Sequence, residues 1–140
     1  MVGRTHRNAR IISQGAKYIA AFILTFVLLV EAHAMDISEL KGRWALKAVD
    51  GKAVSLGKGE IYFQITDQSI IGYDGCNQFG GSVAQPYLIR KGQRACPPET
   101  MLLPLDLSNP VAQLSRATIR GDKLFLPLPD GKGEAQFRRS

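Results

Sequence analysis

The stretch Gly72-Tyr73-Asp74-Gly75-Cys76-Asn77-Gln78-Phe79-Gly80-Gly81 is the most informative part of this chain. It holds four glycines in ten residues and one of the two cysteines of the chain; the other, Cys96, lies twenty residues downstream. Glycine is favoured where the backbone turns tightly or where another group approaches it closely. We therefore expect a tightly folded region around Cys76.

The first 34 residues have the organisation of a secretory signal peptide. A basic segment without acidic residues precedes an uncharged apolar run at 18–30, and Ala32-His33-Ala34 places small residues where a signal peptidase reads. The apolar run has 13 residues, fewer than the roughly 20 that span a bilayer. We expect export to the periplasm or the medium, cleavage after Ala34 and no stable membrane insertion afterwards. An uncleaved anchor is the alternative, and Glu31 directly after the run favours it.

Residues 35–140 have the length of one small domain, which we expect to be a monomer. This segment contains 14 Lys and Arg and 11 Asp and Glu, so its formal net charge is +3, against +6 for the whole chain. Such an excess is ordinary for a soluble domain. No basic cluster with interleaved aromatic residues is present, so the sequence predicts no nucleic-acid binding.

Two cysteines in an exported chain indicate a single disulfide formed in an oxidising compartment. A bridge between them would close a loop of about 20 residues and stabilise the fold by roughly 3 kcal/mol. Two separate, buried thiols are the alternative. A metal site is disfavoured, because both histidines, His6 and His33, lie in the segment that we expect to be removed.

The pattern of residues 35–140 predicts a mainly β domain of the α+β class. Turn signals recur every 8–12 residues, which is typical of a small antiparallel β barrel-like or curved sheet. Pro86 places a weaker strand at an edge or a bulge. The expected strands are at 44–49, 60–66, 69–73, 81–90 (the weaker one), 117–120, 123–128 and 134–138.

One short helix is expected before the last hairpin. Ser108 or Asn109 can cap it, and Pro110 suits the first helical position. A preceding turn at 98–103 could also be helical, but Pro104 ends it. The apolar positions that would face the core from this region are Val111, Leu114 and Ile119.

Several segments, in this order and spacing, resemble the META domain family of HslJ-like bacterial envelope proteins. The opening Leu40-Lys41-Gly42-Arg43-Trp44, the block at 95–99 and the hairpin at 119–126 are similar to the family pattern. The most specific motif of the family is a glycine followed by Gly-Cys-Asn-x-aromatic-x-Gly. With the second cysteine, the matching residues are Gly72, Gly75, Cys76, Asn77, Phe79, Gly81 and Cys96.

The resemblance implies a Cys76–Cys96 disulfide in a non-enzymatic envelope protein of a family linked to stress and antibiotic tolerance. Three departures from the family pattern stand out. The stretch between residues 81 and 96 is shorter, and Lys91-Gly92-Gln93-Arg94 replaces the segment that usually carries a threonine. Pro104 and Pro110 interrupt what is usually a longer amphipathic helix.

The chemistry of residues 35–140 argues against catalysis and against a cofactor. Without histidine, the domain cannot use a Ser-His or Cys-His nucleophile, and no phosphate-binding glycine loop is present. Asp74 and Glu99 remain as candidates, because a disulfide would bring them into one neighbourhood and paired carboxylates can hydrolyse glycosidic bonds. We prefer Asp74 as a turn residue and Glu99 as a cap of the turn after Pro97 and Pro98.

Two residue types offer contacts to a partner. Asn77 could present its amide to a peptide, although an Asn in such a turn more often bonds nearby backbone. Tyr73 and Tyr87 are the expected exposed aromatic residues. The aromatic residues expected in the core are Trp44, Tyr62, Phe63, Phe79, Phe125 and Phe137.

We expect a periplasmic binding or scaffolding module for an unidentified protein or peptide partner. An inhibitor-like or chaperone-like domain is the first alternative, and it would show an exposed apolar patch or an open sheet edge. A carbohydrate-active hydrolase that uses Asp74 and Glu99 is the second, and it would show a deep polar cleft.

Overall fold

The computed structural model of the 140-residue chain describes residues 33–55 and 59–140. The chain divides into two units, Met1–His33 and Ala34–Ser140, and the second contains all the secondary structure described below. The basic and apolar parts of the expected signal peptide lie outside the described residues. Within the described ranges, no helix is long and apolar enough to cross a membrane.

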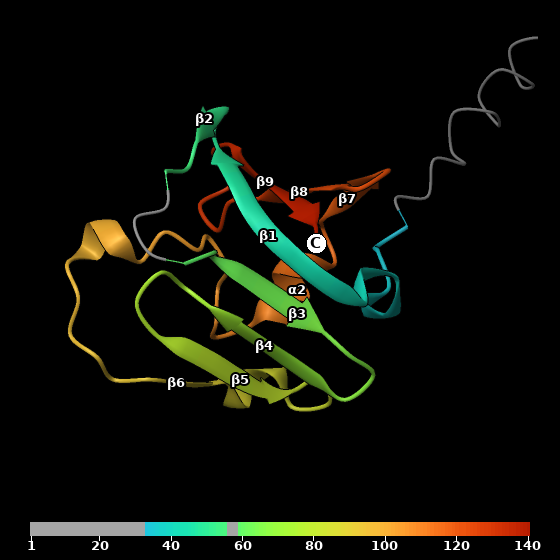
Figure 1. The fold of residues 1–140 in the computed structure, drawn as a ribbon. Helices are drawn as coiled ribbons and strands as arrows, with labels where there is room; N and C mark the ends of the chain where they lie inside the picture. The colour runs from blue at the N-terminus through green and yellow to red at the C-terminus, as the bar shows by residue number, and fades with distance from the viewer. Residues whose placement is uncertain (1–32, 56–58) are drawn as a thin grey trace, which may run out of the picture. The chain divides into compact units, whose positions relative to one another are not determined.

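Nine strands in the described ranges form one antiparallel sheet (Figure 1). The order β6-β5-β4-β3-β1-β9-β8-β7 leaves β6 and β7 as edges, and β2 pairs with the end of β1. The mainly β class is confirmed, and the sheet is open rather than closed into a barrel. The strands are β1 Gly42–Val49, β2 Lys52–Ala53, β3 Tyr62–Ile65, β4 Ser69–Tyr73, β5 Gln78–Ser82, β6 Arg90–Lys91, β7 Thr118–Arg120, β8 Lys123–Pro127 and β9 Glu134–Arg139.

The central strand β1 belongs to both halves of the sheet. It pairs with β3 over its first half and with β9 from Trp44 onward. The register with β9 shifts between Leu46 and Ala48, so Lys47 is an extra residue on β1. Such a bulge bends a strand and reverses which side chains face the core. Val49 consequently packs against the core after the bulge, as Trp44 and Leu46 do before it.

The sheet is curved around its own core. Phe63 on β3 and Phe137 on β9 lie on opposite sides of β1, and neighbouring strands are about 4.8 Å apart. Their ring centroids are nevertheless only 5.0 Å apart, in an edge-to-face arrangement. The two side chains therefore lean toward each other across the concave face.

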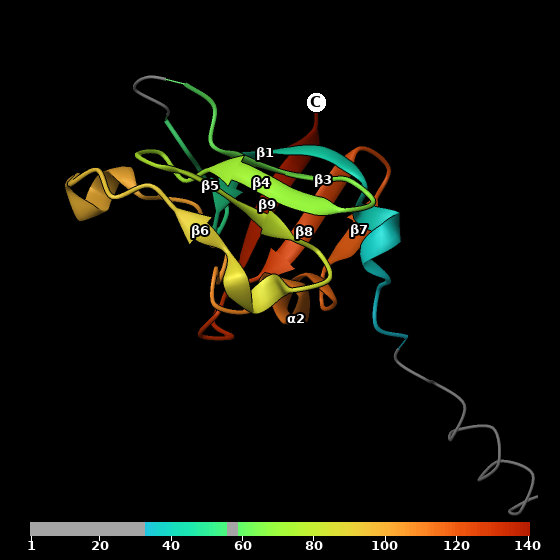
Figure 2. The same ribbon diagram turned by 90° about the horizontal axis from the view of Figure 1, so that it is seen from below.

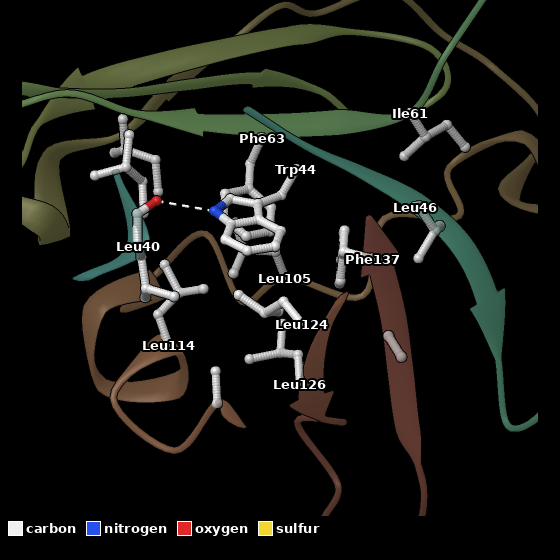
Figure 3. Packing of buried hydrophobic residues seen from close by; sticks show 14 of the residues in the cluster. Leu40, Trp44, Leu46, Ile61, Phe63, Leu105, Leu114, Leu124, Leu126 and Phe137 are labelled. Atoms are coloured by element: carbon white, nitrogen blue, oxygen red, sulfur yellow. Dashed lines mark hydrogen bonds between the residues drawn. The ribbon is translucent and has the colours of Figure 1, made fainter. Parts of the chain in front are cut away.

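Apolar side chains from both halves fill this concave face (Figure 3). Trp44 is fully buried, and its Nε1–H donates a hydrogen bond of 2.9 Å to the carbonyl oxygen of Leu40. This bond satisfies the one polar group that the indole brings into the core. The other fully or nearly fully buried residues of the cluster include Leu46, Ile61, Phe63, Leu105, Leu114, Leu124, Leu126 and Phe137.

The helices are short. The helix α2, Pro110–Leu114, begins as predicted: Pro110 is in its first turn, and the Asn109 side chain accepts a hydrogen bond from the backbone N–H of Ala112. Leu114 is fully buried, and Ile119 packs against the core from β7, which lies in the expected strand at 117–120. The other helices in the described ranges are the 3₁₀ turns η1 Ile37–Leu40, η2 Pro86–Leu88 and η3 Pro98–Thr100.

One sequence prediction about the strands is wrong, and two aromatic residues expected in the core are only partly buried. The expected strand at 81–90 does not form: β5 lies earlier, inside the glycine-rich stretch, and η2 and β6 follow it. Gly72 on β4 explains the shift, because a Cβ atom there would overlap the Phe79 ring of the neighbouring β5. The glycines thus allow close strand packing as well as turns. Tyr62 and Phe125 are only half-buried, with the guanidinium groups of Arg43 and Arg120 over their rings.

Candidate functional site

A disulfide joins the turn after β4 to the segment that follows β6. Cys76 is buried and Cys96 half-buried, and their Cα atoms are 6.2 Å apart. This separation lies within the range that bridged cysteines normally show. The structure therefore contains the predicted disulfide, and the glycine-rich stretch packs against the residues that precede Cys96.

Asp74 organises the turn that carries Cys76. One carboxylate oxygen, Oδ1, accepts hydrogen bonds from the backbone N–H groups of Cys76 at 2.8 Å and Asn77 at 2.7 Å. The other oxygen, Oδ2, lies 2.7 Å from the Nζ of Lys91. Both oxygens of this buried carboxylate are therefore engaged within the fold.

The pKa of Asp74 reflects two opposing effects. Burial disfavours the charged carboxylate, but the Lys91 ammonium and the backbone N–H groups of Asn77 and Cys76 outweigh it and hold the pKa below its usual value. The carboxylate is thus ionised at neutral pH. An ionised carboxylate carries no proton to donate, so it is poorly suited to act as a general acid.

Asn77 connects the turn to the irregular segment after β6. Its Oδ1 accepts a hydrogen bond of 2.8 Å from the backbone N–H of Arg94, and its Nδ2 donates one of 3.0 Å to the Arg94 carbonyl oxygen. The amide is buried, so of the two roles that we considered, bonding to backbone is the one observed. Gly92 makes room for it, since a Cβ atom there would lie 2.9 Å from Oδ1.

A second segment closes over the same turn. The carbonyl oxygen of Asp74 accepts hydrogen bonds from the backbone N–H of Leu102 at 3.0 Å and, less closely, of Leu103. Gly75 has a φ of 107°, and a Cβ atom there would overlap the carbonyl oxygen of Thr100. Only glycine fits both the backbone conformation and this contact. The turn, the disulfide and residues 91–102 together form what we call the disulfide cluster.

The two carboxylates proposed from the sequence differ in their surroundings. Asp74 is buried in the disulfide cluster, whereas Glu99 is exposed on η3. Sequence reasoning missed the partners of Asp74 and Asn77, namely Lys91 and Arg94. Nothing in the sequence links these residues, because their contacts arise only when β6 pairs with β5. Tyr87 is 67% exposed, as predicted, but the Tyr73 hydroxyl donates to the carbonyl oxygen of Gly75.

A shallow depression of about 200 Å³ lies beside α2. This volume is below the roughly 300–1,000 Å³ that small-molecule sites usually have. Neither Asp74 nor Glu99 lines it. Gln113 at its wall is buried and bonded to the backbone of Asp106, Pro104 and Pro127, so it ties irregular segments together. Its lining residues are Asp106, Asn109, Ala112, Gln113, Arg116 and Pro129.

The comparisons with known proteins agree with this architecture. One solved structure, determined by NMR, matches with a TM-score of 0.51 at 17% sequence identity, over 75% of this chain and 95% of the other. At this identity the likeness shows the fold alone. No curated protein matches the chain. The sequence model of the META domain matches residues 38–140, which include β1 through β9 and the disulfide cluster. This chain therefore belongs to the META domain family.

Proposed function

We propose that this protein is exported to the cell envelope and acts there without enzymatic activity, as a binding or scaffolding module. The observation that carries the proposal is the state of the polar motif residues. The Asp74 carboxylate, the Asn77 amide and both cysteines are engaged in internal contacts. These residues stabilise the disulfide cluster and the surface around it. Their internal contacts favour a binding role for that surface over catalysis by the motif residues.

Two observations support export. The compact unit begins at Ala34, next to the expected cleavage site. The backbone nitrogen of Met35 donates a hydrogen bond of 2.9 Å to the carbonyl oxygen of Ser115, and the Met35 side chain packs against the core. Cleavage after Ala34 would leave this first residue anchored, and a disulfide suits an oxidising compartment.

A peptide-binding role, inhibitor-like or chaperone-like, is the second candidate. Large apolar side chains are exposed near one edge of the sheet, and that edge itself is uncovered. Exposed apolar groups and open sheet edges are features through which proteins bind extended segments. The exposed side chains concerned are Tyr87 and Leu88 on η2 and Met101 and Leu102 after η3.

Photo-crosslinking in living cells tests the binding role. The full chain, with a C-terminal affinity tag, carries a photoreactive amino acid at Tyr87 or, as the matched control, at exposed Lys52 on β2. We expect a discrete adduct with an envelope protein from the Tyr87 position and none from the control position. Fractionation with the cytosol, or the absence of an adduct from every exposed position, would contradict the proposal.

The absence of catalysis is tested separately on the purified protein. We expect no hydrolysis of peptidoglycan, other glycans or peptides. Hydrolysis that is lost in both the Asp74→Asn and the Glu99→Gln variants would instead establish the carbohydrate-active alternative. The Glu99→Gln variant is the informative one, because Glu99 is exposed and its loss should leave the fold intact.

The link to stress that the family implies is proposed for this protein too. A strain without the gene should tolerate heat or envelope-directed antibiotics less well than its parent. The wild-type gene should restore tolerance. A Cys76→Ser gene should restore it only in part, because the disulfide cluster holds the surface in place. Equal tolerance of the deleted and parent strains would refute this link.

A further inference from the structure

The β6 edge of the sheet is exposed along its whole length. We define the β6 edge as residues 90–95, of which Arg90–Lys91 are β6 itself; all six residues are exposed. β6 is the last strand in the sheet order, and among the strands that the structure describes it pairs only with β5. In Figure 2 this segment runs along the outside of the sheet between η2 and the loop that leads to η3.

The hydrogen bonds of this edge can be assigned residue by residue. Gly92 N–H donates to the Gln78 carbonyl oxygen at 2.9 Å, and Arg94 bonds the Asn77 side chain through both its N–H and its carbonyl oxygen. Antiparallel pairing alternates, so the backbone groups of Lys91 and Gln93 point away from the sheet. In the described part of the chain, these outward groups have no hydrogen-bond partner.

This edge is held at both ends before any partner binds. At one end β6 pairs with β5, and at the other the Asn77 amide and the disulfide at Cys96 hold the chain. Binding to a strand that is already ordered costs little conformational entropy. The outward N–H and C=O groups therefore form a ready template for an added strand.

The charge of the edge selects its partner. Arg90 and Arg94 are exposed, and in residues 33–55 and 59–140 no carboxylate pairs with either guanidinium. Lys91 adds a third cation, which Asp74 neutralises. A second copy of this chain, pairing edge to edge, would bring like charges together, which is destabilising. An acidic strand would be attracted instead.

We propose that the β6 edge binds an acidic, extended peptide segment of another protein, which adds to the sheet as a strand beside β6. Successive side chains of a strand alternate between faces. Acidic residues at every second position would thus lie on the face of Arg90 and Arg94. Apolar residues between them would share the face of Lys91, whose Nζ lies 3.8 Å from the Met101 sulfur. This inference rests on the proposed binding function and names its partner class.

The opposite edge of the sheet is less suitable. β7 has only three residues, and its central residue Ile119 packs against the core. Just before it, the carbonyl oxygen of Ser115 is already bonded to Met35. Arg120 and Lys123 nevertheless make the β7 hairpin basic, so this edge supplies a control for charge alone.

Peptide titration followed by NMR tests the proposal on protein purified from cells that express the full tagged chain. The probe is an end-capped peptide of alternating Glu and Val. One control peptide has Lys in place of Glu. The other is N-methylated at its valines, whose N–H groups would face Lys91 and Gln93. We expect binding of the first peptide alone, weaker binding at higher salt, and slowed exchange of the Lys91 and Gln93 amide hydrogens.

Charge-reversed variants locate the binding. The Arg90→Glu/Arg94→Glu protein should bind the acidic peptide at least about tenfold more weakly and gain affinity for the basic peptide. The control Arg120→Glu/Lys123→Glu has the same net charge and should bind as the wild type does. Equal loss in both variants, or undiminished binding of the N-methylated peptide, would overturn the proposal in favour of diffuse charge attraction.

The failure of this inference can be told apart from failure of the proposed function. An envelope adduct at Tyr87 that forms equally well in the Arg90→Glu/Arg94→Glu protein would leave the binding module standing and remove the β6 edge as its site. Absence of binding by the acidic peptide would likewise overturn this inference alone.

Discussion

The side chain of Asn77 pairs with the backbone of Arg94 in the way that a strand residue would. Its Oδ1 accepts from the Arg94 N–H, and its Nδ2 donates to the Arg94 carbonyl oxygen, at 2.8 and 3.0 Å. Gly92 pairs with Gln78, the first residue of β5, and the chain before Gln78 turns toward Asp74. The Asn77 amide thus takes the place of backbone at the next position of the β5–β6 ladder. Only an amide carries an acceptor and a donor side by side in this geometry. This requirement explains an Asn directly after Cys76.

Replacing Asn77 by Asp is therefore expected to destabilise the fold. The carboxylate keeps the acceptor but places a second, negatively charged oxygen against the Arg94 carbonyl in a buried site. We expect a loss of about 2–3 kcal/mol in the free energy of unfolding, measured by urea denaturation. Gln93→Ala on the exposed edge is the control and should change it by less than about 0.5 kcal/mol. Equal effects of the two substitutions would disprove the strand-like role of Asn77.

Gly75→Ala should be one of the most damaging single changes in the domain. Gly75 has a φ of 107°, and a Cβ atom would overlap the Thr100 carbonyl oxygen. Gly131→Ala is the matched control: its φ of 71° is also positive, but nothing lies within 4 Å of the added atom. We expect a cost of more than about 3 kcal/mol at Gly75 and about 1 kcal/mol at Gly131, measured by thermal unfolding. Similar losses of stability in the two variants would show that only the positive φ matters, and that the segment around Thr100 moves to accommodate the added Cβ atom.

The strands of this fold could be predicted from sequence where apolar and polar residues alternate. The segment Glu60-Ile61-Tyr62-Phe63-Gln64-Ile65-Thr66 predicts β3, and Asn109-Pro110 predicts the start of α2. The prediction was wrong where glycines form a strand. Gly80 and Gly81 carry no side chains to show a pattern, yet they lie in β5 because Phe79 needs the space over Gly72.

The disulfide cluster could be predicted only in part. Cys76 and Cys96 follow from the cysteine count and the family motif, whereas the roles of Lys91 and Arg94 do not. Their partners, Asp74 and Asn77, are 17 residues away along the chain. A single lysine in a polar stretch gives no sign that its ammonium will meet a buried carboxylate. Only the β5–β6 register, which the sequence left undetermined, brings these groups together.

The Asp74–Lys91 pair predicts a specific pH dependence of stability. Because the pKa of Asp74 is lowered on folding from a usual value of 3.8, the carboxylate contributes stability above that pH and loses it as the pH falls through the lowered pKa. In the Asp74→Asn variant, the amide NH₂ group would face the Lys91 ammonium, so two donors would meet. We expect this variant to lose about 2 kcal/mol of the free energy of unfolding near pH 7. The difference in the free energy of unfolding between the wild type and this variant, measured by urea denaturation, should shrink steadily below pH 3.8.

The control for this pH series is Asp67→Asn. Asp67 pairs with Lys41 at the surface, where 79% of its side chain is exposed. An exposed ion pair contributes at most about 1 kcal/mol. The Asp67→Asn protein should therefore follow the wild type at every pH. An Asp74→Asn difference that stays constant down to the lowest pH would show that the carboxylate charge plays no part.

Processing of the chain can be checked by mass. The full chain, expressed with a C-terminal tag, should yield a product that begins at Met35, because Ala32 and Ala34 satisfy a signal peptidase. Changing both alanines to leucine should leave the precursor uncleaved. In the cleaved wild-type product, the Met35 nitrogen would be an α-ammonium group, which can still donate its hydrogen bond to the Ser115 carbonyl oxygen. Intact-protein mass spectrometry distinguishes the two products, and a wild-type product with the mass of all 140 residues plus the tag would refute cleavage.

The disulfide is expected to account for a large share of the stability of this small domain. It closes a loop of 20 residues and holds Cys96 against a buried turn, so its loss should cost roughly 2–4 kcal/mol. Cys76→Ser should lower the midpoint of thermal unfolding by many degrees, since a domain of this size has only about 5–15 kcal/mol in total. Dithiothreitol should have the same effect on the wild type and none on the variant. Two free thiols in the denatured, freshly isolated protein, or a midpoint indifferent to reductant, would show that Cys76 and Cys96 are not bridged in the cell.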